Sequence, residues 1–97
     1  MVEEILSEGK ENAITGRDLC TILGITRREL MAQVERERRA GAPICASMGV
    51  NPGYYKAKDQ REMWLYCESL YRRGVSIIDT RRELLETLNT LPESEEF

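Results

Sequence analysis

The stretch from residue 15 to residue 41 predicts two short helices joined by a very tight connection. Thr15 and Thr26 are residue types that cap helix N-termini, and each has a carboxylate three positions later that can bond back to the cap amide. Gly24 tolerates the left-handed conformation that closes a helix, so we expect the first helix over residues 16–23. Only two residues separate this helix from the next cap, which forces the helices to cross steeply.

The composition is that of one folded helical domain. The chain has 97 residues, of which 41% are hydrophobic and 32% are charged. A chain of this length buries about 60–65% of its unfolded surface, which is enough for a single small core but not for an enclosed active-site cleft. No run approaches a membrane span, and the mixed acidic start is unlike a secretory signal. We expect a cytoplasmic protein that is not an enzyme, with no membrane partner and no small-molecule ligand.

The chain has three cysteines and no histidine. Cys20, Cys45 and Cys67 are widely spaced and form no Cys-x-x-Cys pair, so neither a disulfide framework nor a zinc site is indicated. Without histidine the chain lacks the commonest general base. Because these cysteines fall on apolar helix faces or in a strand, we expect buried, inert thiols rather than a redox switch. No catalytic residue, metal site or cofactor is therefore predicted.

Charge is unevenly distributed along the chain. The formal net charge is −3, yet residues 15–58 contain eight basic side chains against four acidic ones, a local balance of +4. Residues 1–14 and the C-terminal end are acidic. A polyanion would be steered toward the middle of the sequence.

Three further short elements follow from the pattern. Val2–Glu8 is expected to form a first helix, and Pro43–Ser47 and Tyr54–Ala57 to form two strands. Turn residues over Met48–Gly53 join the strands into a hairpin. Neighbours on a strand point to opposite sides, so one of the two adjacent tyrosines is expected in the core and the other at the surface.

The longest predicted element is a helix from Gln60 to about Asn89, capped by Asp59 with Glu62 three residues later. Its apolar positions follow alternating steps of three and four residues, with a second row repeating every seven residues beside them. Gly74 lies on the first row, as either a close helix contact or a break into two helices. This apolar face is too wide to stay solvated.

We expect the remaining apolar face to be buried by self-association as a homodimer. The alternative is a monomer in which the helix breaks near Gly74 and folds back. Trp64 is interpreted as an anchor against the hairpin or against a partner chain. The predicted dimerisation residues are Trp64, Leu70, Tyr71, Ile77, Ile78, Leu84, Leu85 and Leu88.

The order of two tightly linked helices, the second rich in arginine, and a hairpin wing resembles a winged helix-turn-helix of the kind found in the biotin-repressor amino-terminal domain. The segments Leu-Gly-Ile-Thr-Arg-Arg-Glu-Leu, Ala-Gly-Ala-Pro-Ile-Cys-Ala-Ser and Gly-Tyr-Tyr are also similar to small phage and mobile-element DNA-binding proteins of Gram-positive bacteria. The resemblance implies a mainly α fold with a small β-hairpin and binding of double-stranded DNA, as a transcription regulator or accessory factor. It implies a winged helix-turn-helix over 1–58, while the apolar pattern indicates a C-terminal helical dimerisation or packing segment over 59–91 and its absence a disordered tail over 92–97.

In such folds the helix that corresponds to residues 27–40 enters the major groove. With Leu30 and Val34 set inward, helical geometry turns the arginine-rich face outward. Arg28 lies in the first turn, where a forked guanidinium can bond two acceptors of one guanine, so it is the preferred base contact together with its neighbour Arg27. The other basic groups are expected on phosphates, with the first turn of the preceding helix as an anion anchor. The predicted DNA-contacting set is Arg17, Thr26, Arg27, Arg28, Met31, Ala32, Glu35, Arg36, Arg39, Lys56 and Lys58.

Two acidic residues modify this interpretation. Glu37 stands where related sequences have a third apolar residue, and we expect it to pair with a neighbouring arginine. Glu35 points toward the supposed groove, where it repels phosphate unless it accepts from cytosine. The alternative for the arginines is a solvated helix face in which Glu35 and Arg39 form a four-residue pair. The alternative function is a protein-interaction module on the same scaffold without DNA binding.

Overall fold

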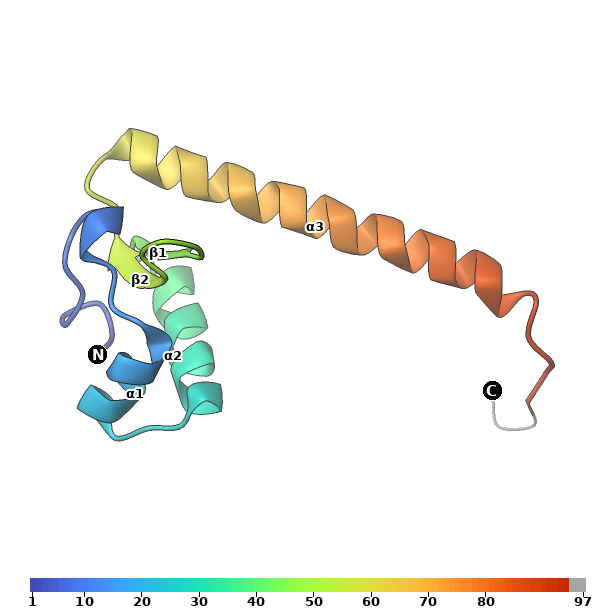
Figure 1. The fold of residues 1–97 in the computed structure, drawn as a ribbon, viewed down its shortest axis with the longest axis horizontal. Helices are drawn as coiled ribbons and strands as arrows, with labels where there is room; N and C mark the ends of the chain where they lie inside the picture. Colours follow the sequence, from blue (N-terminus) through green and yellow to red (C-terminus); the bar gives the residue numbers. More distant parts are fainter. Residues whose placement is uncertain (95–97) are drawn as a thin grey trace. The chain divides into compact units, whose positions relative to one another are not determined.

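The computed structural model describes residues 1–94 (Figure 1). Two compact units divide the chain, the first comprising Met1–Tyr66 and the second beginning at Cys67. The expected fold class, mainly helical with one small hairpin, is confirmed. In chain order the elements are the 3-10 helix η1 (Lys10–Asn12), helices α1 (Gly16–Leu23) and α2 (Arg27–Arg39), strands β1 (Ile44–Ser47) and β2 (Gly53–Lys56), and helix α3 (Gln60–Leu88).

The two tightly linked helices begin at the caps that the sequence predicts. Thr15 Oγ1 accepts a hydrogen bond from the Asp18 amide at 3.1 Å, and Gly24 closes α1 with a φ of 66°. At the start of α2, Thr26 Oγ1 accepts from the Glu29 amide and the Glu29 carboxylate accepts from the Thr26 amide, both at 3.1 Å. The hydrogen bond with the Thr26 backbone amide, followed by the hydrogen bond with the Thr26 side chain, lowers the pKa of the Glu29 carboxyl. These bonds fix where α2 starts relative to α1.

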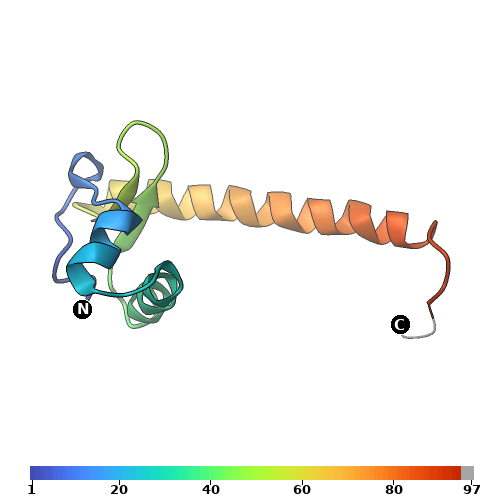
Figure 2. The ribbon, with the colours of Figure 1, turned by 60° about the horizontal axis from the view of Figure 1, so that its bottom comes forward.

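The hairpin is held on both edges of its second strand. β1 and β2 pair antiparallel, with Cys45 opposite Tyr55. On the other edge of β2, Ile14 and Tyr54 exchange two backbone hydrogen bonds at 2.9 and 2.7 Å. Gly53 has a φ of 134°, and a Cβ at this position would overlap the Ile14 carbonyl, so only glycine fits where the segments meet. Figure 2 shows the loop between β1 and β2 extending beyond the strands.

The prediction of a helix over Val2–Glu8 is wrong. This segment forms only a turn at Glu3–Ile5, and η1 follows it. The physical reason is the open edge of β2. The Lys56 amide donates to the Ser7 carbonyl and the Gly9 amide donates to the Lys56 carbonyl, each at 2.9 Å. Backbone groups that a helix would pair internally are used by the sheet instead.

Two clusters of buried side chains form the core of the first unit. Tyr54 packs against the larger cluster and Tyr55 is buried in the smaller one, so the prediction that one of these tyrosines lies at the surface is wrong. The first turns of α3 belong to this core through Tyr66 and the half-buried Met63. The larger cluster contains Val2, Leu6, Leu19, Leu30, Val34 and Ile44, and the smaller one contains Cys45, Tyr55 and Tyr66.

Helix α3 is continuous through Gly74. Of the two alternatives for Gly74, the break is therefore excluded, and a Cβ added there would meet no atom of the described residues within 4 Å, so they make no close contact at this position. The Asp59 cap is confirmed, since its carboxylate accepts from the Glu62 amide at 2.9 Å. Of the tail expected over 92–97, the last three residues lie outside the described residues.

The cysteines differ in burial. Cys45 is fully buried and Cys20 is half-buried, but Cys67 is exposed, which contradicts the expectation of three buried thiols. Cys67 does lie on an apolar row of α3, as the periodicity indicates. That row is simply not covered by any other described part of this chain.

Candidate nucleic-acid interface

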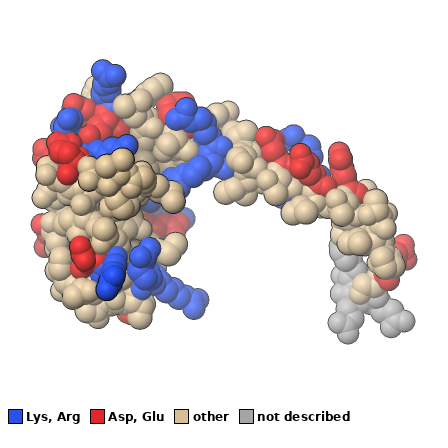
Figure 3. Space-filling model, viewed as in Figure 1, with Lys and Arg blue, Asp and Glu red and all other residues tan. Residues whose placement is uncertain are grey.

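The outward face of α2 carries the arginine-rich side chains. Leu30 and Val34 are buried, so the predicted inward row is confirmed. In Figure 3, Lys and Arg side chains project from the first unit where α2 lies, with acidic side chains nearby. The exposed residues of this face are Arg28, Met31, Ala32, Glu35, Arg36 and Arg39.

The three arginines on this face differ in their surroundings. Arg39 lies 2.6 Å from the Glu35 carboxylate, which confirms the four-residue pair; both side chains are exposed, so the pair is worth only about 0–1 kcal/mol. Arg36 donates to the side-chain oxygen of Gln33. Among residues 1–94, Arg28 has no hydrogen-bond or ion-pair partner. The guanidinium best placed to meet an external acceptor is therefore that of Arg28.

Arg27 lies over the start of α1. An added Cβ at Gly16 would be only 3.0 to 3.2 Å from three atoms of the Arg27 guanidinium, so the missing side chain makes room for it. Arg17 is exposed in the same first turn. The Arg27 guanidinium thus lies at the N-terminus of α1, in whose first turn Arg17 is also exposed, and backbone amides and the helix dipole favour an anion there. Thr26, also predicted to contact DNA, is exposed and uses its hydroxyl as the α2 cap.

Two lysines follow one another at the end of the hairpin and just after it. Lys56 is half-buried at the end of β2, and Lys58 is exposed just before α3. The Glu62 carboxylate is close by, because it accepts hydrogen bonds from the backbone amides of Lys58 and Lys10 at 3.1 and 3.3 Å. The local positive potential is correspondingly reduced.

The hairpin loop has an apolar tip that the sequence analysis treated only as a turn. Met48 and Val50 are 85% and 98% exposed. The Ser47 hydroxyl donates to the Asn51 carbonyl at 2.6 Å and closes the loop beneath them. The signal for this feature was two apolar residues within a turn sequence.

Arg38 has a structural role. Its Nε donates to the Ile44 carbonyl and its Nη2 donates to the Tyr66 hydroxyl, both at 2.8 Å. The guanidinium also lies over the Tyr66 ring, 5.2 Å from the ring centroid. Arg38 therefore joins α2, β1 and the first turns of α3, and it is not part of the exposed face.

Glu37 bonds to the N-terminal segment and not to an arginine, so the predicted pairing is wrong. Its carboxylate accepts from the backbone amides of Val2 and Glu3 at 2.9 and 2.8 Å, and from the Gln33 side chain at 2.8 Å. Burial alone would raise its pKa, but these hydrogen bonds outweigh burial and lower it. The missing apolar contact of α2 is replaced by an anchored carboxylate.

The buried tyrosine of β2, Tyr55, keeps its phenol proton at neutral pH. Burial, followed by the nearby Cys45 and Glu62, raises the pKa of Tyr55 to about 12.

Within residues 1–94, His, Cys, Asp and Glu side chains form no group suited to holding a metal ion. No helix in the same part of the chain has both the length and the apolar character needed to cross a bilayer.

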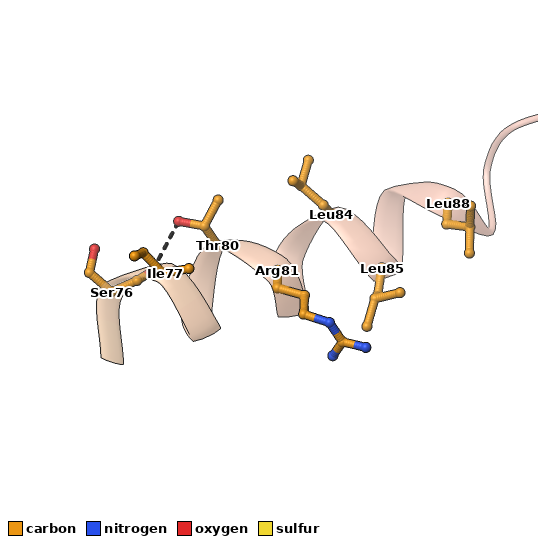
Figure 4. A pocket seen from close by; sticks show the side chains of 7 residues that line it. All are labelled: Ser76, Ile77, Thr80, Arg81, Leu84, Leu85 and Leu88. Atoms are coloured by element: carbon orange, nitrogen blue, oxygen red, sulfur yellow. Dashed lines mark hydrogen bonds between the residues drawn. The ribbon is translucent and has the colours of Figure 1, made fainter. Parts of the chain in front are cut away.

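Of the predicted dimerisation residues, Trp64 lies in the first unit, and the other seven lie in the second unit, where they form an exposed surface. All eight are exposed, including Trp64 at 61%, so the structure does not show Trp64 anchored on the hairpin. Part of this surface is a shallow hollow along α3 in the second unit (Figure 4). Its lining residues are Ser76, Ile77, Thr80, Arg81, Leu84, Leu85 and Leu88.

Comparison of this chain with protein-family models, with curated proteins and with solved structures finds no significant match.

Proposed function

We propose that this chain is a winged helix-turn-helix protein that binds double-stranded DNA with the exposed face of α2. The observation that carries the proposal is the geometry of that helix. α2 is fixed by a reciprocal cap at Thr26 and by two buried residues, while Arg28, Arg36 and Arg39 remain outside the core. The order of α1, α2 and a hairpin whose second strand also pairs with Ile14 supports the same architecture.

Each basic group has a distinct role in this proposal. Arg28, without an internal partner, reads a base edge in the major groove. Arg36 and Arg39, nearer the end of α2, meet phosphates. Arg17 and Arg27 hold a phosphate at the first turn of α1, where amides also point outward. Lys56 and Lys58 extend the backbone contact along the hairpin.

The acidic residue on this face favours selective over indiscriminate binding. Glu35 either accepts from a cytosine amino group or stays paired with Arg39. With a formal net charge of −3, the whole chain also lacks the excess of cations that non-specific binders use. We propose a cytoplasmic regulator of transcription or a phage or mobile-element accessory factor, acting as a homodimer that presents two copies of α2 to a two-fold symmetric site.

The test is a titration, at two salt concentrations, of a fluorescent duplex selected from a random-sequence pool for binding to this protein. With the roughly ten phosphate contacts of the proposed dimer, affinity falls by about 10⁵-fold between 50 and 200 mM salt. Arg28→Ala weakens binding by about 5- to 150-fold, which corresponds to ~1–3 kcal/mol. Arg72→Ala, an exposed arginine of α3, is the matched control and leaves binding unchanged. Equal affinity of Arg28→Ala and the unaltered chain would exclude the proposed role of α2.

A second candidate is a protein-interaction module without DNA binding. It is favoured by the two highly exposed apolar side chains at the hairpin tip, Met48 and Val50. Absence of duplex binding even at low salt, for mixed and for selected sequences, would favour this second function.

A further inference from the structure

The apolar surface of the second unit is built on a heptad repeat. From Cys67 onward, α3 has positions that alternate by steps of three and four residues, flanked on one side by a row that repeats every seven. In heptad letters, row d contains Leu70, Ile77 and Leu84, row a contains Cys67, Gly74, Arg81 and Leu88, and row e contains Tyr71, Ile78 and Leu85. The apolar members of all three rows, and Cys67, are exposed.

We propose that this face is covered by the same face of a second copy of the chain, with the two α3 helices running antiparallel and the two Ile78 side chains meeting near the centre. The inference rests on the proposed function for its purpose, since it defines the homodimer used there. Three independent features of α3 select the second copy and the antiparallel direction.

The first feature is the composition of the rows that flank the seam. In a parallel pair, row e of one helix lies beside row g of the other, whereas in an antiparallel pair row e lies beside row e. Row g is polar in this unit, with Arg73, Thr80 and Thr87. Parallel pairing would thus place Ile78 beside Arg73 of the second copy. Antiparallel pairing places apolar row e on apolar row e and polar row g on polar row g.

The second feature is the pair of exceptions in row a. A parallel pair in register would place Gly74 against Gly74, leaving a void, and Arg81 against Arg81, with like charges in one layer. In the antiparallel register centred near Ile78, Gly74 lies opposite Leu84 of the second copy. Arg81 lies opposite Ile77, so its aliphatic stem covers apolar surface while its guanidinium reaches solvent. Figure 4 shows Arg81 extending to the same side of α3 as Leu85.

The third feature is the distribution of charge along α3. In the second unit's part of this helix, residues 67–77 have a formal net charge of +1 and residues 78–88 have a formal net charge of −1. Antiparallel pairing sets the half with net positive charge beside the half with net negative charge of the second copy, whereas parallel pairing sets halves of like net charge beside each other. The helix dipoles also favour the antiparallel pair, because each helix then lies beside a helix whose dipole points the opposite way.

The test is oxidative cross-linking of the full chain, combined with sedimentation and with mapping of each disulfide by mass spectrometry. In the antiparallel pair the two Cys67 thiols are separated by about 36 Å, from 24 residues at ~1.5 Å each, so the unaltered chain gives no Cys67–Cys67 bond. Ile78→Cys, in a Cys67→Ser background, forms a cross-linked dimer, because its Cβ atoms come within the reach of a disulfide. Thr80→Cys in the same background tests row g, on the other side of the seam between the two helices, independently of Ile78→Cys.

Glu86→Cys, on the outer face of α3, is the matched control. We expect at least about tenfold less cross-linking for it than for Ile78→Cys. A mapped Cys67–Cys67 disulfide, a monomer in sedimentation at tens of micromolar, or a dimer in which neither central cysteine cross-links would each overturn the proposal. Because no DNA is present, these outcomes are separate from a failure of the chain to bind DNA.

Discussion

At the scale of single residues, the first unit depends on polar groups that reach far along the chain. Glu37 of α2 binds the amides of Val2 and Glu3, and Arg38 binds the Ile44 carbonyl and the Tyr66 hydroxyl. These two adjacent residues hold opposite ends of the unit to α2. Because Glu37 and Arg38 make the hydrogen bonds that join α2 to the rest of the unit, the exposed arginines of α2 are not needed for these contacts.

Glu37→Gln is expected to destabilise the first unit by about 1–3 kcal/mol at neutral pH, because a charged acceptor of backbone amides is lost. Glu37 is only 13% exposed in its side chain, so solvent replaces these bonds poorly. Its pKa is lowered below the ordinary 4.5 in the folded chain. The stabilisation is therefore complete above pH 4.5 and is lost as pH falls through the folded-state pKa.

Urea denaturation followed by near-ultraviolet circular dichroism of the buried tyrosines checks this prediction at neutral and acidic pH. The difference between Glu37→Gln and the unaltered chain should narrow in acid. Glu35→Gln, an exposed acidic residue on the same helix, is the control and changes stability by about 0–1 kcal/mol. A difference that persists unchanged in acid would show that the carboxylate charge is not the cause.

Gly53→Ala tests the contact between β2 and the segment before α1. The new Cβ would overlap the Ile14 carbonyl in a backbone with φ of 134°, so we expect a loss of more than about 2 kcal/mol in stability. Gly41→Ala is the matched control: its φ is 103° but no atom lies within 4 Å, so only backbone strain of about 1 kcal/mol is added. Thermal denaturation of both variants measures the difference, and equal melting temperatures would contradict the steric argument.

At the scale of elements, the sequence predicts those features whose causes are local. The caps at Thr15, Thr26 and Asp59 were predictable because each involves a partner three residues away. The same holds for the buried row of α2 and for its pair between Glu35 and Arg39.

The wrong or missing predictions concern segments and side chains whose partners lie far away in the sequence. The segment over Val2–Glu8 has a helical apolar pattern, but its backbone pairs with Lys56, some fifty positions away, and no local pattern encodes that choice. The amide partners of Glu37 and the placement of Arg27 over Gly16 are non-local in the same way. At the candidate site, which side chains are exposed could be predicted, but which of them are anchored could not.

Thr26→Ala tests the element on which the candidate interface depends. The substitution removes the hydroxyl that accepts the Glu29 amide and should cost about 1 kcal/mol of stability, within the usual range for a lost cap. Thr21→Ala is the control, because its hydroxyl bonds only to the Arg17 carbonyl within α1. Thermal denaturation should show the larger loss for Thr26→Ala, and an equal loss in both variants would contradict a specific capping role.

At the scale of the whole molecule, the two units have different surfaces. The first unit has a core on both faces of β2, whereas the large apolar side chains of α3 after Tyr66 are exposed. Exposed apolar surface of this extent on a helix favours association, since burying it removes the contact with water. We therefore propose that self-association and DNA binding use two different surfaces, which can be altered independently.

Leu84→Glu is expected to produce a monomer, because a carboxylate in row d would be buried without a partner in the dimer. The same variant keeps the exposed face of α2 intact. Sedimentation should give the monomer mass for Leu84→Glu and the dimer mass for Glu86→Gln, which lies on the outer face. A dimer mass for Leu84→Glu would show that this row is not the interface.

If the outward face of α2 binds DNA, as we propose, amide chemical-shift mapping of the full chain during titration with a duplex will locate the contact on that face. We predict that the largest changes fall on residues 26–39 and on the first turn of α1, with smaller ones at Lys56 and Lys58 and none in the outer face of α3. Changes confined to the hairpin tip or to α3, or no changes at low salt with any duplex, would contradict DNA binding by the outward face of α2.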